Sequence, residues 1–150
     1  MIEGVIIKQL IKNEDQRGFL AEIYRADEFD YQPAMSYISL TLPGVIRGPH
    51  EHKEQADFFV FLGPGKFRVF LWDNRPNSPT YSKHQEIEAG EGSPMSILVP
   101  AGVVHGYKCI SEVSGYCLNL PDKLYKGQGK QEEVDEIRWE TDPKSPYKTE

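Results

Sequence analysis

Cysteine and long apolar runs are both scarce in this chain, and each scarcity excludes a class of protein. Its 150 residues include two cysteines, Cys109 and Cys117, too few for a disulfide framework or a thiolate zinc site. We expect them to be buried small hydrophobes in a reducing compartment. No run of about 18 apolar residues is present, so no transmembrane span is expected. The first residues also lack the basic-then-apolar order of a secretory signal, which predicts a cytoplasmic protein with no membrane partner.

An excess of positive charge is absent as well, because 17 lysines and arginines stand against 23 aspartates and glutamates, for a formal net charge of -6 at pH 7. A nucleic-acid partner would require a basic stripe, so none is expected. An anionic small molecule is compatible with this charge, because a few local arginines can bind it. The composition, 39% hydrophobic and 27% charged, is that of a globular protein, and the length suffices for one core. We therefore predict a single domain over residues 1–150.

Helical periodicity is rare, and short β-prone runs closed by glycine or proline dominate the chain. Two such runs, residues 58–62 and 66–72, flank a Gly-Pro-Gly segment and predict a hairpin. Residues 12–16 predict a polar turn, and residues 141–150 predict an exposed strap or a frayed end. The other runs that predict strands are residues 4–10, 19–24, 37–42, 80–87, 97–99, 103–109 and 115–120. This pattern is typical of an all-β sandwich or barrel.

Three histidines are spaced so that a β fold can bring them together. His50 and His52 stand at i and i+2, which puts them on the same face of a strand. His105 follows a Pro-x-Gly turn, where another strand is expected to begin. Three imidazoles that converge inside a barrel can hold a metal ion, or they can move protons on and off a carbon acid.

Five sequence segments occur in an order that resembles one known family. They are DQRGFLAE from Asp15, GVIRGPH from Gly44, DNR from Asp73 with SPT from Ser78, VPAGVVHGY from Val99, and IRW from Ile137. Together they resemble the dTDP-4-dehydrorhamnose 3,5-epimerase family over residues 3–143. The resemblance implies an all-β cupin-type double-stranded β-helix, or jelly-roll barrel, with short peripheral helical turns. It also implies a homodimer that epimerises a dTDP-4-keto-6-deoxyhexose, without a cofactor, in deoxysugar and cell-surface polysaccharide biosynthesis.

Epimerisation beside a keto group requires a base on one face, a proton donor on the other, and a positive or donating group near the enolate oxygen. The resemblance implies that His50 is the base and that His105 lines the sugar site. It implies substrate-binding roles for Arg17 on phosphate, Phe19 on thymine, Glu22 on the base or ribose, Arg47 on the diphosphate or an oxyanion, and Asn119. The residues alone also allow Arg17 to pair with Asp15, Arg47 to close an ion pair at the barrel mouth, and Phe19 to join the core.

Two positions depart from the family pattern. The family's proton-donating tyrosine falls on Asn119 when the match is extended without gaps, and its oxyanion-side lysine falls near Asp57. An amide has no proton suited to this transfer. Tyr116 and Tyr107 are the nearest tyrosines in sequence that could take the place of the missing donor.

A second interpretation rests on RGPHEHK at residues 47–53. This segment resembles the Arg-Gly-x-His-x-His-Lys of dTDP-4-keto-6-deoxyhexose 3,4-ketoisomerases, which also carry a catalytic tyrosine ten residues before the arginine. Tyr37 has that spacing from Arg47. Such an enzyme moves the keto group through an enediol, with His50 and His52 transferring protons and Tyr37 holding an oxygen.

A third interpretation is a metal-dependent cupin, in which a divalent transition metal is the cofactor. The general cupin pattern of His-x-His, a carboxylate and Pro-x-Gly-x-x-His is met by His50, His52, Asp57 and His105. Three imidazoles and a carboxylate suit iron, zinc, manganese or nickel. Asp57 stands in place of the usual glutamate and reaches less far. A sugar-nucleotide binder without catalysis is the fourth alternative.

Overall fold

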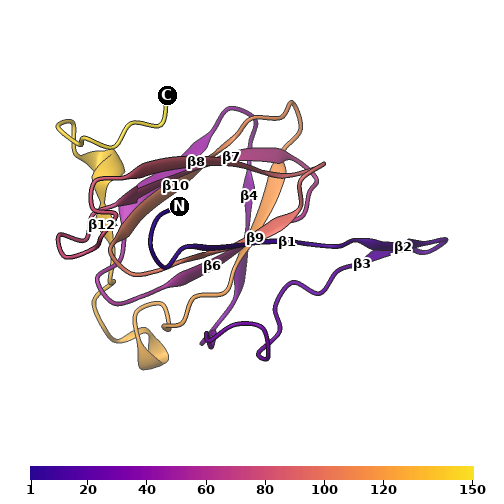
Figure 1. Ribbon diagram of the computed structural model, residues 1–150, viewed down its shortest axis with the longest axis horizontal. Helices are drawn as coiled ribbons and strands as arrows, with labels where there is room; N and C mark the ends of the chain where they lie inside the picture. Colours follow the sequence, from indigo (N-terminus) through magenta and orange to yellow (C-terminus); the bar gives the residue numbers. More distant parts are fainter.

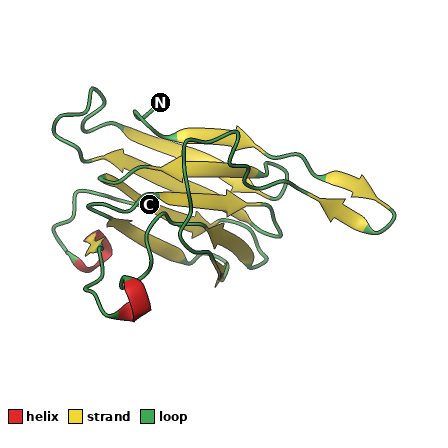
Figure 2. Cartoon of the chain, turned by 90° about the horizontal axis from the view of Figure 1, so that it is seen from below, coloured by secondary structure: helices red, strands yellow, loops and turns green.

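The computed structural model describes residues 1–150 and consists of two five-stranded antiparallel sheets packed face to face (Figure 1, Figure 2). The first sheet has the order β1-β9-β6-β11-β4, and the second has the order β12-β5-β10-β7-β8. The first contains β1 (Ile6–Gln9), β4 (Tyr37–Thr41), β6 (Asp57–Phe61), β9 (Met95–Val99) and β11 (Gly115–Asn119). The second contains β5 (Ile46–Glu51), β7 (Lys66–Asp73), β8 (His84–Gly90), β10 (Val103–Cys109) and β12 (Ile137–Arg138). The predicted all-β double-sheet architecture is confirmed.

The main hydrophobic core fills the space between the two sheets. Phe59 and Phe61 of β6 point into it, and the Phe61 ring lies 5.1 Å from the ring of Phe67 in β7. Phe58 and Val60 point the other way, into a second apolar cluster beneath the loop that precedes β4. Burial of each such side chain stabilises the fold by about 1.5–3 kcal/mol. Both faces of β6 are therefore covered, which explains its continuous apolar sequence.

The predicted hairpin between residues 58–62 and 66–72 is wrong. β6 pairs with β9 and β11, whereas β7 pairs with β8 and β10, so the two strands belong to different sheets. The segment between them is a corner that crosses from one sheet to the other. At Gly65, with φ +90°, an added Cβ would lie 2.4 Å from the Cα of Gly115, so glycine is required. A Gly-Pro-Gly signal marks a reversal of the chain, but it does not say whether the next strand pairs locally.

β2 (Asn13–Asp15) and β3 (Gly18–Leu20) form a separate hairpin that projects from the barrel (Figure 1, Figure 2). Every residue of the two strands is exposed. The turn predicted at residues 12–16 is therefore wrong, because residues 13–15 form a strand, and the strand predicted at residues 19–24 is too long. Hydrophobic alternation does not mark these strands, because neither buries an apolar face within this chain.

Residues 121–150 wrap around the mouth of the barrel and the outer face of the second sheet. They contain the 3-10 turns η1 (Gln128–Lys130) and η2 (Trp139–Thr141), with β12 between them. The tail is a packed strap and is not frayed, because the Tyr147 ring lies 5.5 Å from Trp72 and 5.1 Å from Trp139. None of the helical turns has the length and apolar character needed to cross a membrane.

Candidate active site

A pocket of about 1010 Å³ lies at the mouth of the barrel, bounded by both sheets and by segment 121–140. Tyr37 and Ser39 line it from the first sheet, and Arg47 and His50 line it from the second. His52, which directly follows β5, also contributes to the wall. Ligand pockets commonly measure about 300–1,000 Å³. This pocket is therefore large enough for a ligand bigger than a single sugar ring.

Strand pairing brings His50 and His105 together, because they face each other in the register of β5 and β10. Their ring centroids are 4.6 Å apart, and the ring of His52 lies 5.6 Å from each. The strands approach closely at Gly48, where φ is +82° and an added Cβ would lie 2.7 Å from the His105 carbonyl oxygen. At Gly106 an added Cβ would lie 2.9 Å from a β5 carbonyl oxygen. These two glycines permit the approach that clusters the imidazoles.

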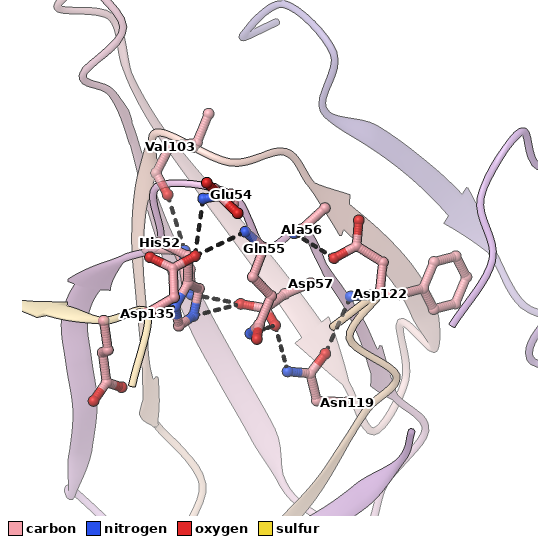
Figure 3. Close-up of polar contacts among 12 residues, drawn as sticks. His52, Glu54, Gln55, Ala56, Asp57, Val103, Asn119, Asp122 and Asp135 are labelled. Atoms are coloured by element: carbon pink, nitrogen blue, oxygen red, sulfur yellow. Dashed lines mark hydrogen bonds and ion pairs between the residues drawn. The ribbon is translucent and has the colours of Figure 1, made fainter. Parts of the chain in front are cut away.

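The buried carboxylate of Asp57 joins this cluster (Figure 3). Its Oδ2 lies 3.1 Å from Nε2 of His52 and 3.1 Å from Nε2 of His105. Its Oδ1 accepts hydrogen bonds from Gln55 Nε2 at 2.9 Å and from Asn119 Nδ2 at 2.8 Å. The Asp57 side chain is only 1% exposed. These four partners therefore replace water around its negative charge.

The second nitrogen of each of these two imidazoles also faces an acceptor. Nδ1 of His52 donates to the backbone carbonyl of Asp135, and Nδ1 of His105 donates to the Val103 carbonyl at 2.9 Å. A ring between a carbonyl and a carboxylate satisfies both when it carries two protons. Burial lowers the pKa of His52, but the hydrogen bond and charge of Asp57 outweigh burial and raise the pKa to about 9. His52 is therefore an imidazolium at neutral pH.

Asp57 and His50 take the complementary charge states. Burial by itself raises the pKa of Asp57, but the hydrogen bonds from His105 and His52 outweigh it and hold the pKa well below its usual range. For His50, burial first and then the nearby charges of His105 and His52 lower the pKa to about 3. The cluster thus combines an ionised carboxylate and a positive ring with a neutral imidazole that lines the pocket.

Asp135 ties the C-terminal wall of the pocket to the turn that follows β5 (Figure 3). Its carboxylate accepts the backbone N–H groups of Lys53 at 2.8 Å, Glu54 at 2.9 Å and Gln55 at 3.0 Å. Burial raises the pKa of Asp135, but these three hydrogen bonds outweigh burial and lower it. Asp135 is not predicted as a site residue by any sequence motif. It stands in an acidic run, and its partners lie 80 to 82 positions away, so no local signal marks it.

Arg47 and Tyr37 line the pocket, and each is held from behind. Arg47 donates from Nε to Thr41 Oγ1 at 2.9 Å and from Nη2 to the Leu40 carbonyl at 2.7 Å. The Tyr37 hydroxyl accepts a hydrogen bond from Asn119 Nδ2 at 2.9 Å. Asn119 itself is 1% exposed and does not line the pocket. The structure therefore places Asn119 behind the wall of the pocket, where it holds Tyr37 and Asp57.

Three predicted nucleotide-binding residues lie away from this pocket within one chain (Figure 1). Arg17, in the turn of the β2–β3 hairpin, pairs with Asp15 at 2.5 Å, and its side chain is 83% exposed. Phe19 in β3 is 52% exposed, so the alternative that it joins the core is wrong. Glu22 is exposed in the segment that follows the hairpin. The projecting hairpin turns all three outward from the barrel that carries it.

The imidazole cluster also matches the donor set of the predicted metal site. Nitrogen atoms of His50, His52 and His105 lie within 4.8 Å of one another, and Asp57 adjoins two of these rings. Hydrogen bonds from Nδ1 to backbone carbonyls, as at His52 and His105, commonly orient metal-bound imidazoles. These four residues would hold a divalent transition metal, which would act as a Lewis acid on a carbonyl oxygen. Asp57 nevertheless has its charge balanced by protein groups alone.

The fold and the pocket define a class before any relative is considered. A double-sheet β barrel carries, at its mouth, a neutral imidazole beside a buried imidazolium–carboxylate pair and a fixed arginine. This combination of residues is suited to a jelly-roll enzyme that removes protons from an anionic ligand and returns them to it. The family model described as dTDP-4-dehydrorhamnose 3,5-epimerase matches residues 1–144, and the chain belongs to this family of isomerases.

Two relatives and one solved structure agree with this assignment. The chain is 38% identical over 135 residues to a probable low-salt glycan biosynthesis epimerase of Haloferax volcanii, covering 88% of this chain and 86% of the relative. It is 40% identical over 114 residues to a spore coat polysaccharide biosynthesis protein of Bacillus subtilis, covering 75% and 74%. The crystal structure of a dTDP sugar isomerase from Desulfovibrio desulfuricans G20 has a TM-score of 0.84 at 21% identity, covers 98% of this chain and 91% of its own, and shows the shared fold. These findings favour an epimerase over a ketoisomerase or a metal-dependent cupin.

Proposed function

We propose that the protein epimerises a dTDP-4-keto-6-deoxyhexose next to its keto group, in the biosynthesis of a deoxysugar for a cell-surface polysaccharide. One observation carries the proposal: a neutral His50 lines a pocket large enough for a sugar nucleotide, with Arg47 on the same strand. The family match supports the reaction. The relatives named for glycan and spore coat polysaccharide biosynthesis support the pathway.

In this proposal His50 takes the proton from the carbon beside the keto group, and the electron pair moves onto the carbonyl oxygen as an enolate. Burial first, and then the charges of His105 and His52, lower the pKa of His50 in the free protein. A bound anion opposes those charges, so a substrate diphosphate and a developing enolate both strengthen His50 as a base. The positive charge of His52 also stabilises the enolate oxygen. Return of a proton from the opposite face inverts the carbon.

Arg47 binds the diphosphate in this proposal. Its two hydrogen bonds to β4 hold the guanidinium in one position and leave other N–H groups for a ligand. A guanidinium fixed in this way matches phosphate oxygens with little further loss of side-chain freedom.

We also propose a homodimer in which the β2–β3 hairpin of one chain reaches the pocket of the other. The hairpin projects from its own barrel and carries the exposed Arg17 and Phe19. Strand β4 is a sheet edge, and its outer face presents Ile38 and Leu40, which are 60% and 45% exposed; Leu42, directly after the strand, is 58% exposed. An apolar edge strand of this kind needs a cover. A second chain would provide it.

Mixing two inactive variants tests the shared site. Arg17→Ala removes the hairpin cation, and His50→Asn removes the base, so each homodimer is expected to turn over poorly. Subunit exchange creates heterodimers in which one pocket has an intact base and an intact neighbouring hairpin, so activity returns in part. A dimer by light scattering whose mixture stays inactive would contradict the shared pocket, and a monomer would contradict the homodimer itself.

We propose that the reaction needs no metal or other cofactor. The observation in support is that both oxygens of the Asp57 carboxylate have protein partners: Oδ2 lies 3.1 Å from Nε2 of His52 and of His105, and Oδ1 accepts hydrogen bonds from Gln55 and Asn119. Metal analysis of the purified protein, followed by assay after EDTA treatment, checks this. Full turnover of metal-free protein supports the proposal, whereas a stoichiometric metal whose removal abolishes turnover contradicts it.

We propose a cytoplasmic location as well. Both Cys109 and Cys117 are buried and unpaired. Free thiols of this kind persist in a reducing compartment.

The decisive experiment is proton NMR of the protein with dTDP-4-keto-6-deoxyglucose in deuterated water. Deuterium that enters at C3, or at C3 and C5, together with an inverted product, is the expected result. A 3-keto product would instead establish the ketoisomerase reaction. Binding of dTDP with no exchange of any carbon-bound proton would leave a sugar-nucleotide binder and would overturn the proposed reaction.

A further inference from the structure

The family resemblance puts the proton-donating tyrosine at Asn119, and a phenol lies directly beside this residue. Asn119 in β11 and Tyr37 in β4 are register partners across the two strands. The Tyr37 hydroxyl lies 2.9 Å from Asn119 Nδ2, and Tyr37 lines the pocket while Asn119 does not. A hydroxyl is thus present at the site, but it comes from the neighbouring strand.

The hydrogen bonds of Asn119 determine whether the Tyr37 hydroxyl donates its proton to the protein or keeps it for a ligand. Asn119 Oδ1 accepts the Phe58 N–H at 3.1 Å, which orients the amide. Its two Nδ2 protons then go to Asp57 Oδ1 at 2.8 Å and to the Tyr37 hydroxyl oxygen at 2.9 Å. Tyr37 is therefore the acceptor in that contact, and its own O–H proton is not consumed by it. A buried amide holds the phenol and leaves its proton for a ligand in the pocket.

Tyr37 and His50 approach the pocket from opposite sheets. Tyr37 belongs to β4 of the first sheet and His50 to β5 of the second, and both line the same cavity. A sugar ring that lies between the sheets presents one face to each. This is the arrangement that inversion requires, because one group must remove a proton and the other must deliver one from the far side.

The other tyrosines near the site do not meet these conditions. The Tyr107 hydroxyl shares a hydrogen bond with Ser39 Oγ at 3.0 Å, and the residue is 5% exposed. Tyr116 is a register partner of Leu40, on the outward face of the first sheet. Tyr125 lines the pocket from the C-terminal segment, but its hydroxyl is held by no hydrogen bond, whereas that of Tyr37 is held by Asn119.

We infer that Tyr37, held by Asn119, is the catalytic acid that protonates the enolate on the face opposite His50. This inference rests on the proposed function. The C–H bond breaks as His50 takes the proton, and the electron pair moves onto the keto oxygen. The enolate carbon then takes the Tyr37 O–H proton, which regenerates the ketone with inverted configuration. The phenolate recovers a proton from solvent and His50 releases one, so no net proton is consumed.

The electrostatics of Tyr37 agree with a donor. Burial raises the pKa of its phenol to about 12, against the smaller opposing effect of the Asn119 hydrogen bond. The hydroxyl therefore carries its proton at neutral pH, as an acid must before it delivers that proton.

The test is Tyr37→Phe in the dTDP-4-keto-6-deoxyglucose assay in deuterated water, with wild type and His50→Asn in parallel. Without the acid, His50 still removes the proton and returns a solvent deuteron to the same face. Tyr37→Phe is therefore expected to retain deuterium exchange into unchanged substrate while inverted product falls by about 100-fold or more. His50→Asn is expected to lose both signals. Tyr81→Phe, the same change at an exposed tyrosine between β7 and β8 that does not line the pocket, is the matched control and keeps wild-type rates.

Three outcomes overturn the assignment. Wild-type inversion in Tyr37→Phe excludes it directly. An equal loss of exchange and inversion means that Tyr37 only supports the pocket. If Tyr125→Phe, and not Tyr37→Phe, retains deuterium exchange while it loses inversion, the catalytic acid is Tyr125 of the C-terminal segment. If wild type itself shows neither exchange nor inversion, the proposed function fails instead, so the two failures are distinguished by the wild-type spectrum.

Discussion

Asp57 Oδ2 lies 3.1 Å from Nε2 of His105, inside the barrel, and both side chains are almost fully buried. The same oxygen is equally close to Nε2 of His52, so one carboxylate oxygen serves two imidazoles. The positions of both rings, and their effect on His50, depend on this single negative charge.

Replacing Asp57 with Asn is expected to destabilise the protein strongly. The amide preserves the size of the side chain but leaves a positive His52 buried without its counter-charge, which typically costs about 3–5 kcal/mol. Urea unfolding at pH 7 measures the change. Asp27→Asn is the control, since its partner Arg25 is exposed and solvent screens such surface pairs. A loss at Asp57→Asn no larger than the control would mean that His52 is neutral.

The free energy of unfolding is expected to fall on both sides of about pH 6.5 in EDTA-treated protein. The pKa of His52 is raised from 6.5 to about 9. Its contribution to the free energy of unfolding is therefore complete below pH 6.5 and is lost as the pH rises through 9. The pKa of His50 is lowered from 6.5 to about 3, so the unfolded chain binds the extra proton and stability falls as the pH drops from 6.5 to 3. Urea unfolding across this range checks both limbs.

A variant separates the two limbs of that profile. His50→Asn removes the group that must stay neutral, so the acid limb is expected to flatten between pH 6.5 and 3 while the alkaline limb remains. The depressed pKa of Asp57 still causes a loss at lower pH, as its carboxylate is protonated. An unchanged acid limb in His50→Asn would show that His50 titrates normally in the folded protein.

Arg47→Ala is expected to weaken dTDP binding by about 10-fold or more, because a hydrogen bond to a charged group typically contributes about 1.5–3 kcal/mol. Arg47→Lys is expected to recover only part of the affinity for dTDP. A lysine has a single ammonium group, so it cannot keep both hydrogen bonds to β4 and also bind phosphate oxygens in a bidentate way. Calorimetric titration with dTDP measures both variants. Arg68→Ala is the control, because Arg68 pairs with Glu88 on the second sheet and does not line the pocket. Equal affinities for all three variants would remove Arg47 from the binding site.

Asp135→Ala is expected to loosen the wall of the pocket without unfolding the barrel. The change leaves three backbone N–H groups without their acceptor. Hydrogen exchange followed by mass spectrometry should show faster exchange in residues 121–140 and in the turn at residues 53–55. Glu133→Ala, an exposed carboxylate in the same segment, should leave exchange unchanged. Similar exchange in both variants would mean that other contacts hold the segment.

Much of the candidate site was predictable from the chain because its signals are local. The i, i+2 spacing of His50 and His52 predicts that they face the same way, and in the structure His50 lies in β5 and His52 directly after it. The turn before His105 starts β10. Once a β barrel is assumed, these spacings predict convergence, and the structure brings all three rings together. The role of Asp57 as a carboxylate near the histidines was also predictable, although its two additional partners, Gln55 and Asn119, were not.

The sequence by itself determined the all-β class, the extent of the family resemblance and the strand positions of the histidines. Only the tertiary structure decided that β6 and β7 lie in different sheets, that Asp135 reaches back to the turn after β5, and that Asn119 stands beside Tyr37. The physical reason is the range of the interactions. Alternation and turn propensity act over a few residues, whereas strand partners and register are selected by burial of the whole core, between segments about 80 positions apart at Tyr37 and Asn119.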